Sequence, residues 1–127
     1  MPVYTDAKAA DERKNIEESA GKEMSVEERV KEYFKDTPIL AEIARCESTF
    51  RQFDKDGKIL RGDWNSRDVG VMQINERFHL DKALRLGYDI YSLEGNIEYA
   101  KYLYETQGLK PWTHSEKCWN SQKIAKS

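Results

Sequence analysis

Residues 37–48 (TPILAEIARCES) decide the fold, because they form a clear amphipathic helix that ends where the sequence pattern changes. Thr37 can cap this helix, and Pro38 suits its first position, where no backbone N–H is needed. Its buried side is predicted to consist of apolar residues at helical spacing, namely Ile39, Leu40, Ile43 and Ala44. The helix runs directly into Glu47, which precedes a polar segment.

Two further helices are predicted on either side of this segment. Ser25 and Glu28 form a capping box, which predicts a helix over about 26–35. A longer helix begins after Ser92 and ends at Gly108, and its apolar residues again recur at helical spacing. These helices supply enough apolar faces for one core.

The stretch between the second helix and the long helix is mixed in character. Segments 50–53 and 58–61 flank the turn sequence 54–57 (DKDG), which predicts a small β-hairpin. Residues 62–70 have a loop composition, and a short helix is predicted over 81–86. The fold class is therefore α+β, mostly α, with a small β-hairpin after the second helix.

Composition limits both the size and the partners of the protein. A chain of 127 residues fits one domain, predicted over residues 25–119, with a charged N-terminal segment (1–24, a flexible or solvated helix) and a polar tail (120–127). The net charge is −2, and Lys and Arg are interspersed with Asp and Glu, which argues against nucleic-acid binding. No apolar run approaches the roughly 18 residues that a membrane span needs.

The turn at residues 54–57 also resembles part of a calcium-binding loop. Asp54, Asp56, Gly57 and Asp63 occupy suitable positions, but Gln52 and Leu60 do not suit the first and ninth positions. A hairpin turn explains the same residues more simply. We therefore expect no metal and no cofactor.

The two cysteines suggest a covalent link between distant parts of the chain. Cys46 and Cys118 lie 72 positions apart, unlike the close pairs of zinc or redox sites, so the choice is between a disulfide and two buried thiols. A disulfide is favoured, because it would tie the polar C-terminal segment to the domain. It would also indicate an oxidising compartment.

Glu47 is the candidate catalytic residue. It lies at the end of an apolar helix, where a cleft could open beside the hairpin, and burial favours the protonated form of a carboxyl group, which suits a general acid. Most glutamates are nevertheless solvated, so its position alone favours a simple helix-end residue. Its neighbours in sequence change this interpretation.

Three elements occur in a characteristic order: Glu47-Ser48, residues 70–75 (GVMQIN), and Asn96-Ile97 on the long helix. Together they resemble the lytic transglycosylase domain related to goose-type lysozyme, over about residues 37–119. The resemblance implies a lysozyme-like fold with its small hairpin after the catalytic helix. It also implies cleavage of the β-1,4 bond between N-acetylmuramic acid and N-acetylglucosamine in peptidoglycan. We expect the protein to be a monomer that acts in an extracytoplasmic compartment, reached by a signal or anchor outside this sequence.

The resemblance assigns roles to individual residues. Glu47 would protonate the glycosidic oxygen, and the substrate-binding residues would be Ser48, Asp68, Met72, Gln73, Asn75, Asn96 and Trp112. Alternatives stay open for several of them, since Gln73 could satisfy loop backbone, Met72 could pack beneath the cleft, and Asp68 could cap a turn. The segment around Trp112 departs from the family pattern, and His114 within it is expected to be a surface residue.

The reaction itself has two versions. In a lytic transglycosylase Glu47 then acts as a base toward the 6-hydroxyl of the sugar, which gives a 1,6-anhydro product. In an inverting hydrolase a second carboxylate, here Asp63 or Asp68, activates water instead. A third alternative is a glycan-binding module that has kept the cleft without turnover.

Overall fold

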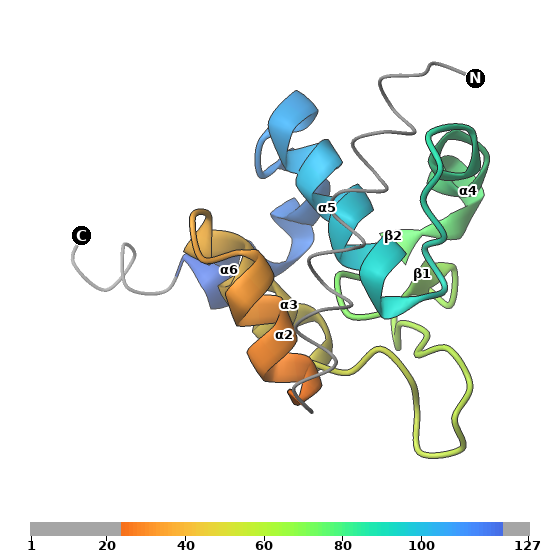
Figure 1. Ribbon diagram of the computed structural model, residues 1–127, viewed down its shortest axis with the longest axis horizontal. Coiled ribbons are helices and arrows are strands. Elements are labelled where there is room, and N and C mark those ends of the chain that lie inside the picture. Colours follow the sequence, from red (N-terminus) through yellow and green to blue (C-terminus); the bar gives the residue numbers. More distant parts are fainter. Residues whose placement is uncertain (1–23, 121–127) are drawn as a thin grey trace.

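The computed structural model describes residues 24–120, and Figure 1 shows their arrangement. In chain order the elements are α2 Val26–Tyr33, α3 Pro38–Ser48, β1 Asp68–Val69, β2 Ile74–Asn75, α4 Glu76–Arg85, α5 Leu93–Gln107, the 3₁₀ helix η1 Lys110–Ser115, and α6 Glu116–Trp119. Helices dominate and one two-stranded antiparallel sheet accompanies them, which confirms the predicted α+β, mostly α class. The expected N-terminal segment and C-terminal tail lie almost wholly outside the described residues.

Local capping explains where the helices begin. The capping box of Ser25 and Glu28 is present at the start of α2, and the Ser92 side chain accepts a backbone hydrogen bond in the first turn of α5. Pro38 occupies the start of α3 as predicted. Thr37 occupies the N-cap position as predicted, but its side chain makes no capping hydrogen bond.

Helix α4 begins earlier than the sequence suggested. A helix was predicted over 81–86, whereas α4 spans Glu76–Arg85. The Asn75 side-chain oxygen accepts a hydrogen bond from the Phe78 N–H, and this cap starts the helix five residues sooner. The cap matters for the site, because it turns the chain directly from β2 into α4.

The hairpin predicted around residues 54–57 is present, but it is small. Phe53 and Ile59 form an isolated antiparallel bridge, and Asp54 Oδ1 accepts the N–H groups of Asp56 (2.8 Å) and Lys58 (3.0 Å) across the turn. This use of Asp54 agrees with a hairpin turn. Within residues 24–120, no group of three or more His, Cys, Asp or Glu residues is placed to hold a metal ion.

The named strands β1 and β2 come from the segment predicted as a loop and the apolar segment after it. Their register pairs Asp68 with Asn75 and Val69 with Ile74. Val69 and Ile74 are buried in the core, whereas Asp68 and Asn75 are partly exposed on the other face. The sheet therefore has one core face and one polar face.

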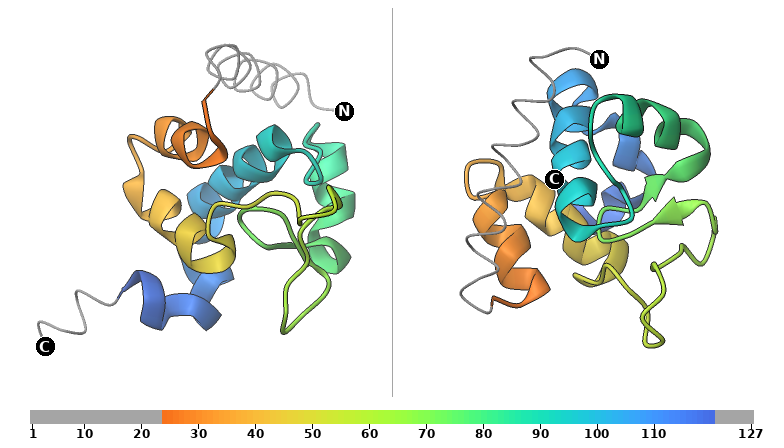
Figure 2. Two further views of the ribbon diagram at one scale, coloured as in Figure 1. Left: turned by 90° about the horizontal axis from the view of Figure 1, so that it is seen from below. Right: turned by 45° about the vertical axis from the view of Figure 1, so that its right-hand side comes forward.

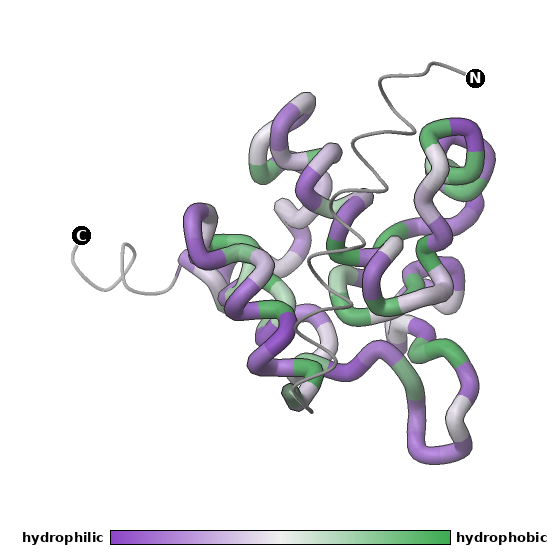
Figure 3. The backbone as a smooth tube through the Cα atoms, viewed as in Figure 1, coloured by the Kyte–Doolittle hydropathy of each residue, from purple (hydrophilic) through white to green (hydrophobic). Residues whose placement is uncertain are grey.

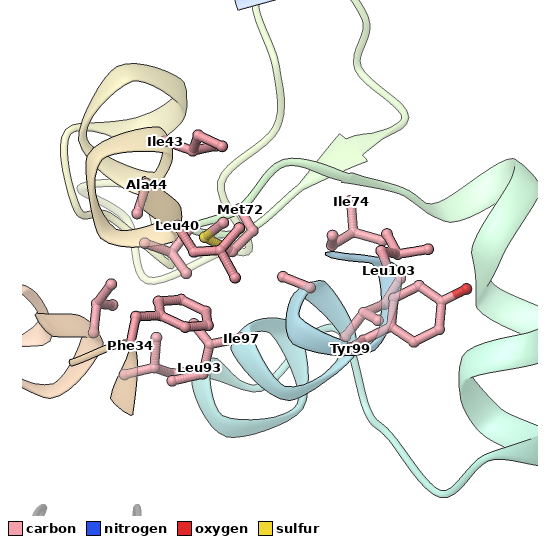
Figure 4. Close-up of a cluster of buried hydrophobic side chains, with 14 of the residues drawn as sticks. Phe34, Leu40, Ile43, Ala44, Met72, Ile74, Leu93, Ile97, Tyr99 and Leu103 are labelled. Atoms are coloured by element: carbon pink, nitrogen blue, oxygen red, sulfur yellow. The ribbon is translucent and has the colours of Figure 1, made fainter. Parts of the chain in front are cut away.

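The core forms around α5, against which α3 and the segment that carries Met72 pack (Figure 4). In Figure 3, hydrophilic and hydrophobic stretches alternate along α2 and α3, as expected of helices with one buried face. Arg29 of α2 also pairs with Glu94 at the start of α5. The largest fully buried apolar side chains are Trp112, Tyr99, Phe34, Leu40, Ile43, Met72, Ile74, Ile90, Ile97 and Leu103.

The predicted disulfide between Cys46 and Cys118 is present. Its sulfur atoms are 2.08 Å apart, and it joins the last turn of α3 to α6. The link holds the end of the described chain beside Glu47, the neighbour of Cys46. Over residues 24–120, none of the helices has the length and apolar character that crossing a membrane requires.

Removing the disulfide should destabilise the fold measurably. The bond closes a long loop, with 72 positions between its cysteines, and a loop of this size is expected to contribute about 2–4 kcal/mol. We expect the double variant Cys46→Ser/Cys118→Ser to lose about that much unfolding free energy in urea denaturation. Dithiothreitol should lower the stability of the wild type but leave the double variant unchanged, and an equal effect on both would contradict the assignment.

Candidate active site

The Glu47 side chain lies in the last turn of α3 and is only 6% exposed. Two residues of η1 contact its carboxylate. The Ser115 hydroxyl donates a hydrogen bond to Oε2 at 2.6 Å, and His114 Nε2 lies 3.1 Å from Oε1 and 2.9 Å from Oε2. Glu47 is therefore not a solvated helix-end residue, because a segment more than sixty residues later covers and orients its carboxyl group.

A small network fixes this covering segment. Trp119 Nε1 donates to the Ser115 hydroxyl and to the Trp112 carbonyl oxygen, both at 3.1 Å. The disulfide at Cys118 anchors the same turn to α3. The Ser115 hydroxyl oxygen accepts from Trp119, and its single proton has two acceptors within reach, Glu47 Oε2 at 2.6 Å and the Trp112 carbonyl oxygen at 3.1 Å, of which Glu47 is the nearer.

His114 was expected at the surface, and its side chain is 58% exposed. Its contact with Glu47 was missed by the sequence analysis. Sequence spacing carries no local signal for a pair 67 positions apart, and the only hint was the predicted disulfide, which brings Cys118 close to Cys46. The structure therefore adds both His114 and Ser115 to the candidate site.

A groove of about 590 Å³ lies beside this cluster. Its walls come from the loop before β1, the two strands, α4, the end of α5 and η1. The lining residues are Trp64, Asn65, Asp68, Gln73, Ile74, Asn75, Phe78, His79, Leu103, Gln107, Pro111, Trp112 and His114. Glu47 does not line the groove itself, but His114 lies on its wall and contacts Glu47 directly.

The predicted substrate-binding residues separate into two sets. Asp68, Gln73, Asn75 and Trp112 line the groove. Ser48, Met72 and Asn96 do not line it and are at most 3% exposed, so a direct sugar contact by their side chains is a wrong expectation. Trp112 is also nearly enclosed, at 1% exposure.

The buried residues instead hold the tight turn at 70–73, which carries Gln73 into the groove. The Ser48 hydroxyl donates to the Val71 carbonyl oxygen (2.8 Å), and Trp112 Nε1 donates to the Met72 carbonyl oxygen (3.0 Å). Both side chains satisfy backbone groups that are buried away from water. Their role is to shape the wall of the groove from below.

Asn96 completes the support from α5. Its Oδ1 accepts the Met72 N–H at 2.9 Å, and its Nδ2 donates to the carbonyl oxygens of Val69 (3.0 Å) and Ile90 (2.8 Å). Gly70 makes room for this amide, because a Cβ at this position would lie 2.3 Å from Asn96 Nδ2. Gly70 also has φ +76°, a conformation that favours glycine.

Three side chains both line the groove and make hydrogen bonds within the fold: Asp68, Gln73 and Asn75. Gln73 Nε2 donates one hydrogen bond to the Gly70 carbonyl oxygen (2.9 Å), so its second N–H and its Oε1 are the groups able to meet a ligand. Asp68 Oδ1 accepts a hydrogen bond from Asn75 Nδ2 (3.1 Å). Asp63, the other candidate second carboxylate, is exposed and does not line the groove.

A second polar cluster surrounds Glu76, at the start of α4. Its Oε2 accepts hydrogen bonds from Arg61 (2.9 Å) and Arg67 (3.3 Å), and its Oε1 accepts one from the Tyr91 hydroxyl (2.7 Å). These hydrogen bonds, that of Arg61 first and that of Tyr91 second, lower the pKa of Glu76 to about 2. The ionised carboxylate joins the loop before β1 to α4 and to the residue before Ser92.

His79 also has a partner that the sequence did not reveal. Its Nδ1 lies 2.9 Å from the Tyr99 hydroxyl of α5, and the two rings pack edge to face. Burial, with a smaller effect of Lys82, lowers the pKa of His79, and burial raises the pKa of Tyr99 to about 12. Both groups are therefore neutral near pH 7 and form an uncharged part of the groove wall.

Comparison of the chain with protein-family models, with curated proteins and with solved structures finds no significant match.

Replacing Asn96 by alanine should destabilise the protein strongly. The change leaves one buried N–H and two buried carbonyl oxygens without this partner, and each unsatisfied group costs about 1–3 kcal/mol. We expect a loss of about 3 kcal/mol or more in urea denaturation. The exposed amide variant Gln107→Ala is the control and should change stability by less than about 0.5 kcal/mol; equal losses would contradict the role of Asn96.

Glu76 should make the stability of the fold depend on acidic pH. Its pKa in the folded protein is about 2, below the ordinary value of 4.5, so its contribution is complete above pH 4.5 and is lost as the pH falls toward 2. We expect the stability difference between wild type and Glu76→Gln to be largest above pH 4.5 and to shrink between pH 4.5 and 2. Thermal unfolding across this range measures it, and a constant difference would contradict the assignment.

Proposed function

We propose that the protein is a peptidoglycan-cleaving enzyme of the lytic transglycosylase type, with Glu47 as its catalytic acid. The observation that carries the proposal is the carboxyl group of Glu47, oriented by Ser115 and His114 at the edge of a groove. Three elements of the sequence support it: Glu47-Ser48 at the end of α3, residues 70–75, and Asn96-Ile97 on α5. In the fold these features contact one another through Ser48 and Asn96.

The groove suits an uncharged sugar chain. Among the described residues that line it, Asp68 is the only one with a carboxylate, and neither lysine nor arginine contributes to the wall. Amide side chains, which both donate and accept hydrogen bonds, can bind hydroxyl and acetamido groups. This lining favours a glycan over nucleic acid or another phosphate-rich ligand, which would call for basic groups.

The proposed reaction needs one carboxyl group. Glu47 donates its proton to the glycosidic oxygen while the bond from that oxygen to the sugar C1 breaks. The 6-hydroxyl of the same sugar then forms a bond to C1, and its proton returns to Glu47, which gives a 1,6-anhydro end. The Ser115 hydroxyl keeps the carboxyl group in one orientation for both transfers. His114 would move from its place between Glu47 and the groove when a glycan binds.

Hydrolysis is the second candidate, and one observation favours it. Asp68 lies on the groove wall, so its carboxylate could activate water for attack on C1, as in an inverting glycosidase. Asp68 also accepts a hydrogen bond from Asn75, which would orient it for this task. Asp63 lacks a place on the wall and is the weaker candidate.

The partner in this proposal is the glycan strand of peptidoglycan, and the compartment is extracytoplasmic. The disulfide supports an oxidising environment, since such bonds form and persist outside the reducing cytosol. We propose that the protein acts as a monomer, because one chain supplies Glu47, Ser115, His114 and the groove.

The variant Glu47→Gln tests the catalytic assignment. It keeps the size of the side chain but removes the transferable proton, so we expect at least a hundredfold slower release of muropeptides from purified peptidoglycan. The matched control is Glu116→Gln, an exposed glutamate of α6, which should retain full activity. Equal activity of Glu47→Gln and wild type would remove Glu47 from the mechanism.

Mass spectrometry of the products from the same digest separates the two reactions. A 1,6-anhydro end is one water lighter than a reducing end, so a lytic transglycosylase gives products about 18 Da lighter than a hydrolase does. If the wild type instead gives products with reducing ends, and the variant Asp68→Asn no longer forms them, the enzyme is a hydrolase that uses Asp68. Saccharide binding without any product from the wild type would identify a non-catalytic glycan-binding module.

A further inference from the structure

Two large aromatic side chains project from the surface at the border of the groove. Trp64, in the loop before β1, is 103% exposed, and Phe78, in the first turn of α4, is 76% exposed. Both line the groove, yet neither belongs to the core. Exposed apolar rings at the rim of a groove that also carries polar side chains are typical of a ligand-binding surface.

The chain segments that carry these two rings are joined to each other by hydrogen bonds. Arg61 and Arg67 each lie three residues from Trp64, on opposite sides, and both donate hydrogen bonds to the same carboxylate oxygen of Glu76. Glu76 is two residues from Phe78, and its own N–H donates to the Arg67 carbonyl oxygen at 2.8 Å. The Glu76 cluster therefore holds the loop of Trp64 against the helix of Phe78 before any ligand binds.

The chemistry around the rings fits a pyranose sugar. In a β-1,4-linked hexosamine the ring substituents are equatorial, so each face presents axial C–H groups that pack against an aromatic ring. Asn65, next to Trp64, and Asn75, at the start of α4, supply amide groups on the same wall for hydroxyl and acetamido groups. Trp64 and Phe78 thus offer apolar faces with polar partners beside them.

This part of the groove belongs to different elements from the proposed catalytic group. Trp64 and Phe78 are carried by the loop before β1 and by α4, whereas Glu47 belongs to α3 and is covered by η1. In the left view of Figure 2, α4 and the segment of η1 and α6 lie on different sides of the molecule. Binding at the rings can therefore be separated from bond cleavage.

We propose that Trp64 and Phe78 form an aromatic clamp for a β-1,4-linked N-acetylhexosamine chain, at a subsite of the groove distinct from Glu47. The class of ligand rests on the proposed function. The clamp gives the glycan strand a second point of attachment, so that a chain long enough to reach from the clamp to η1 binds better than a short one. Because Glu76 already joins the two segments that carry the rings, less ordering of the backbone is needed on binding, which lowers its entropic cost.

The test measures chitohexaose binding by isothermal titration calorimetry in the full-length Glu47→Gln protein, where turnover does not interfere. We expect Trp64→Ala and Phe78→Ala each to weaken binding about tenfold, as for the loss of one stacked ring, and Trp64→Phe to retain most of the affinity. Phe53→Ala is the matched control, because Phe53 is also an exposed aromatic residue (48%) but does not line the groove. Trp64 and Phe78 are exposed, so their variants should unfold at the same temperature as the parent.

The outcomes distinguish the clamp from the enzyme. Unchanged binding in both alanine variants, or an equal loss in Phe53→Ala, would overturn the clamp while Glu47-dependent cleavage of peptidoglycan could still stand. Weakened binding in both variants, without cleavage by the wild type, would support the clamp and overturn the enzyme. A wild type that neither cleaves peptidoglycan nor binds chitohexaose would overturn both proposals.

Discussion

The turn at residues 70–73 is the constraint on which the rest of the structure depends. It places backbone N–H and C=O groups inside the molecule, where each needs a hydrogen-bond partner. Side chains from distant parts of the chain supply them: Ser48 at the end of α3, Gln52 just after it, Asn96 on α5, and Trp112 on η1. One short turn therefore fixes the relative positions of α3, α5 and η1, and Glu47 on α3 is positioned as a result.

Two supports hold the walls of the groove from opposite sides. On the side of Glu47, the disulfide and the Trp119 hydrogen bonds fix η1, so that Ser115 and His114 meet the carboxyl group. On the other side, Glu76 uses an ionised carboxylate to hold a loop that has little apolar surface of its own. The disulfide holds η1 in place, and the charge-assisted hydrogen bonds of Glu76 hold the loop before β1. The helices, in contrast, are held mainly by packing in the core.

Sequence patterns predicted the helices and the class of fold because local spacing determines both. The predicted start of α4 is wrong, because the Asn75 cap begins the helix at Glu76. The sheet was not anticipated, since two-residue strands have no periodicity to detect.

Among the site residues, motif resemblance alone does not distinguish a side chain that faces the groove from one that supports it. Ser48 and Asn96 satisfy buried backbone groups. The places of His114 and Trp64 on the groove depend on three-dimensional proximity that no short motif encodes.

The cross-link between Cys46 and Cys118 has a further consequence for how the protein responds to proteases. The loop that it closes contains β1, β2, α4, α5 and η1, together with the exposed turn at residues 55–58. A protease that cuts this turn leaves two fragments, but each carries one of the bonded cysteines, so they stay covalently attached. Nicked protein would thus keep its mass, apart from one added water, until a reducing agent separates the fragments.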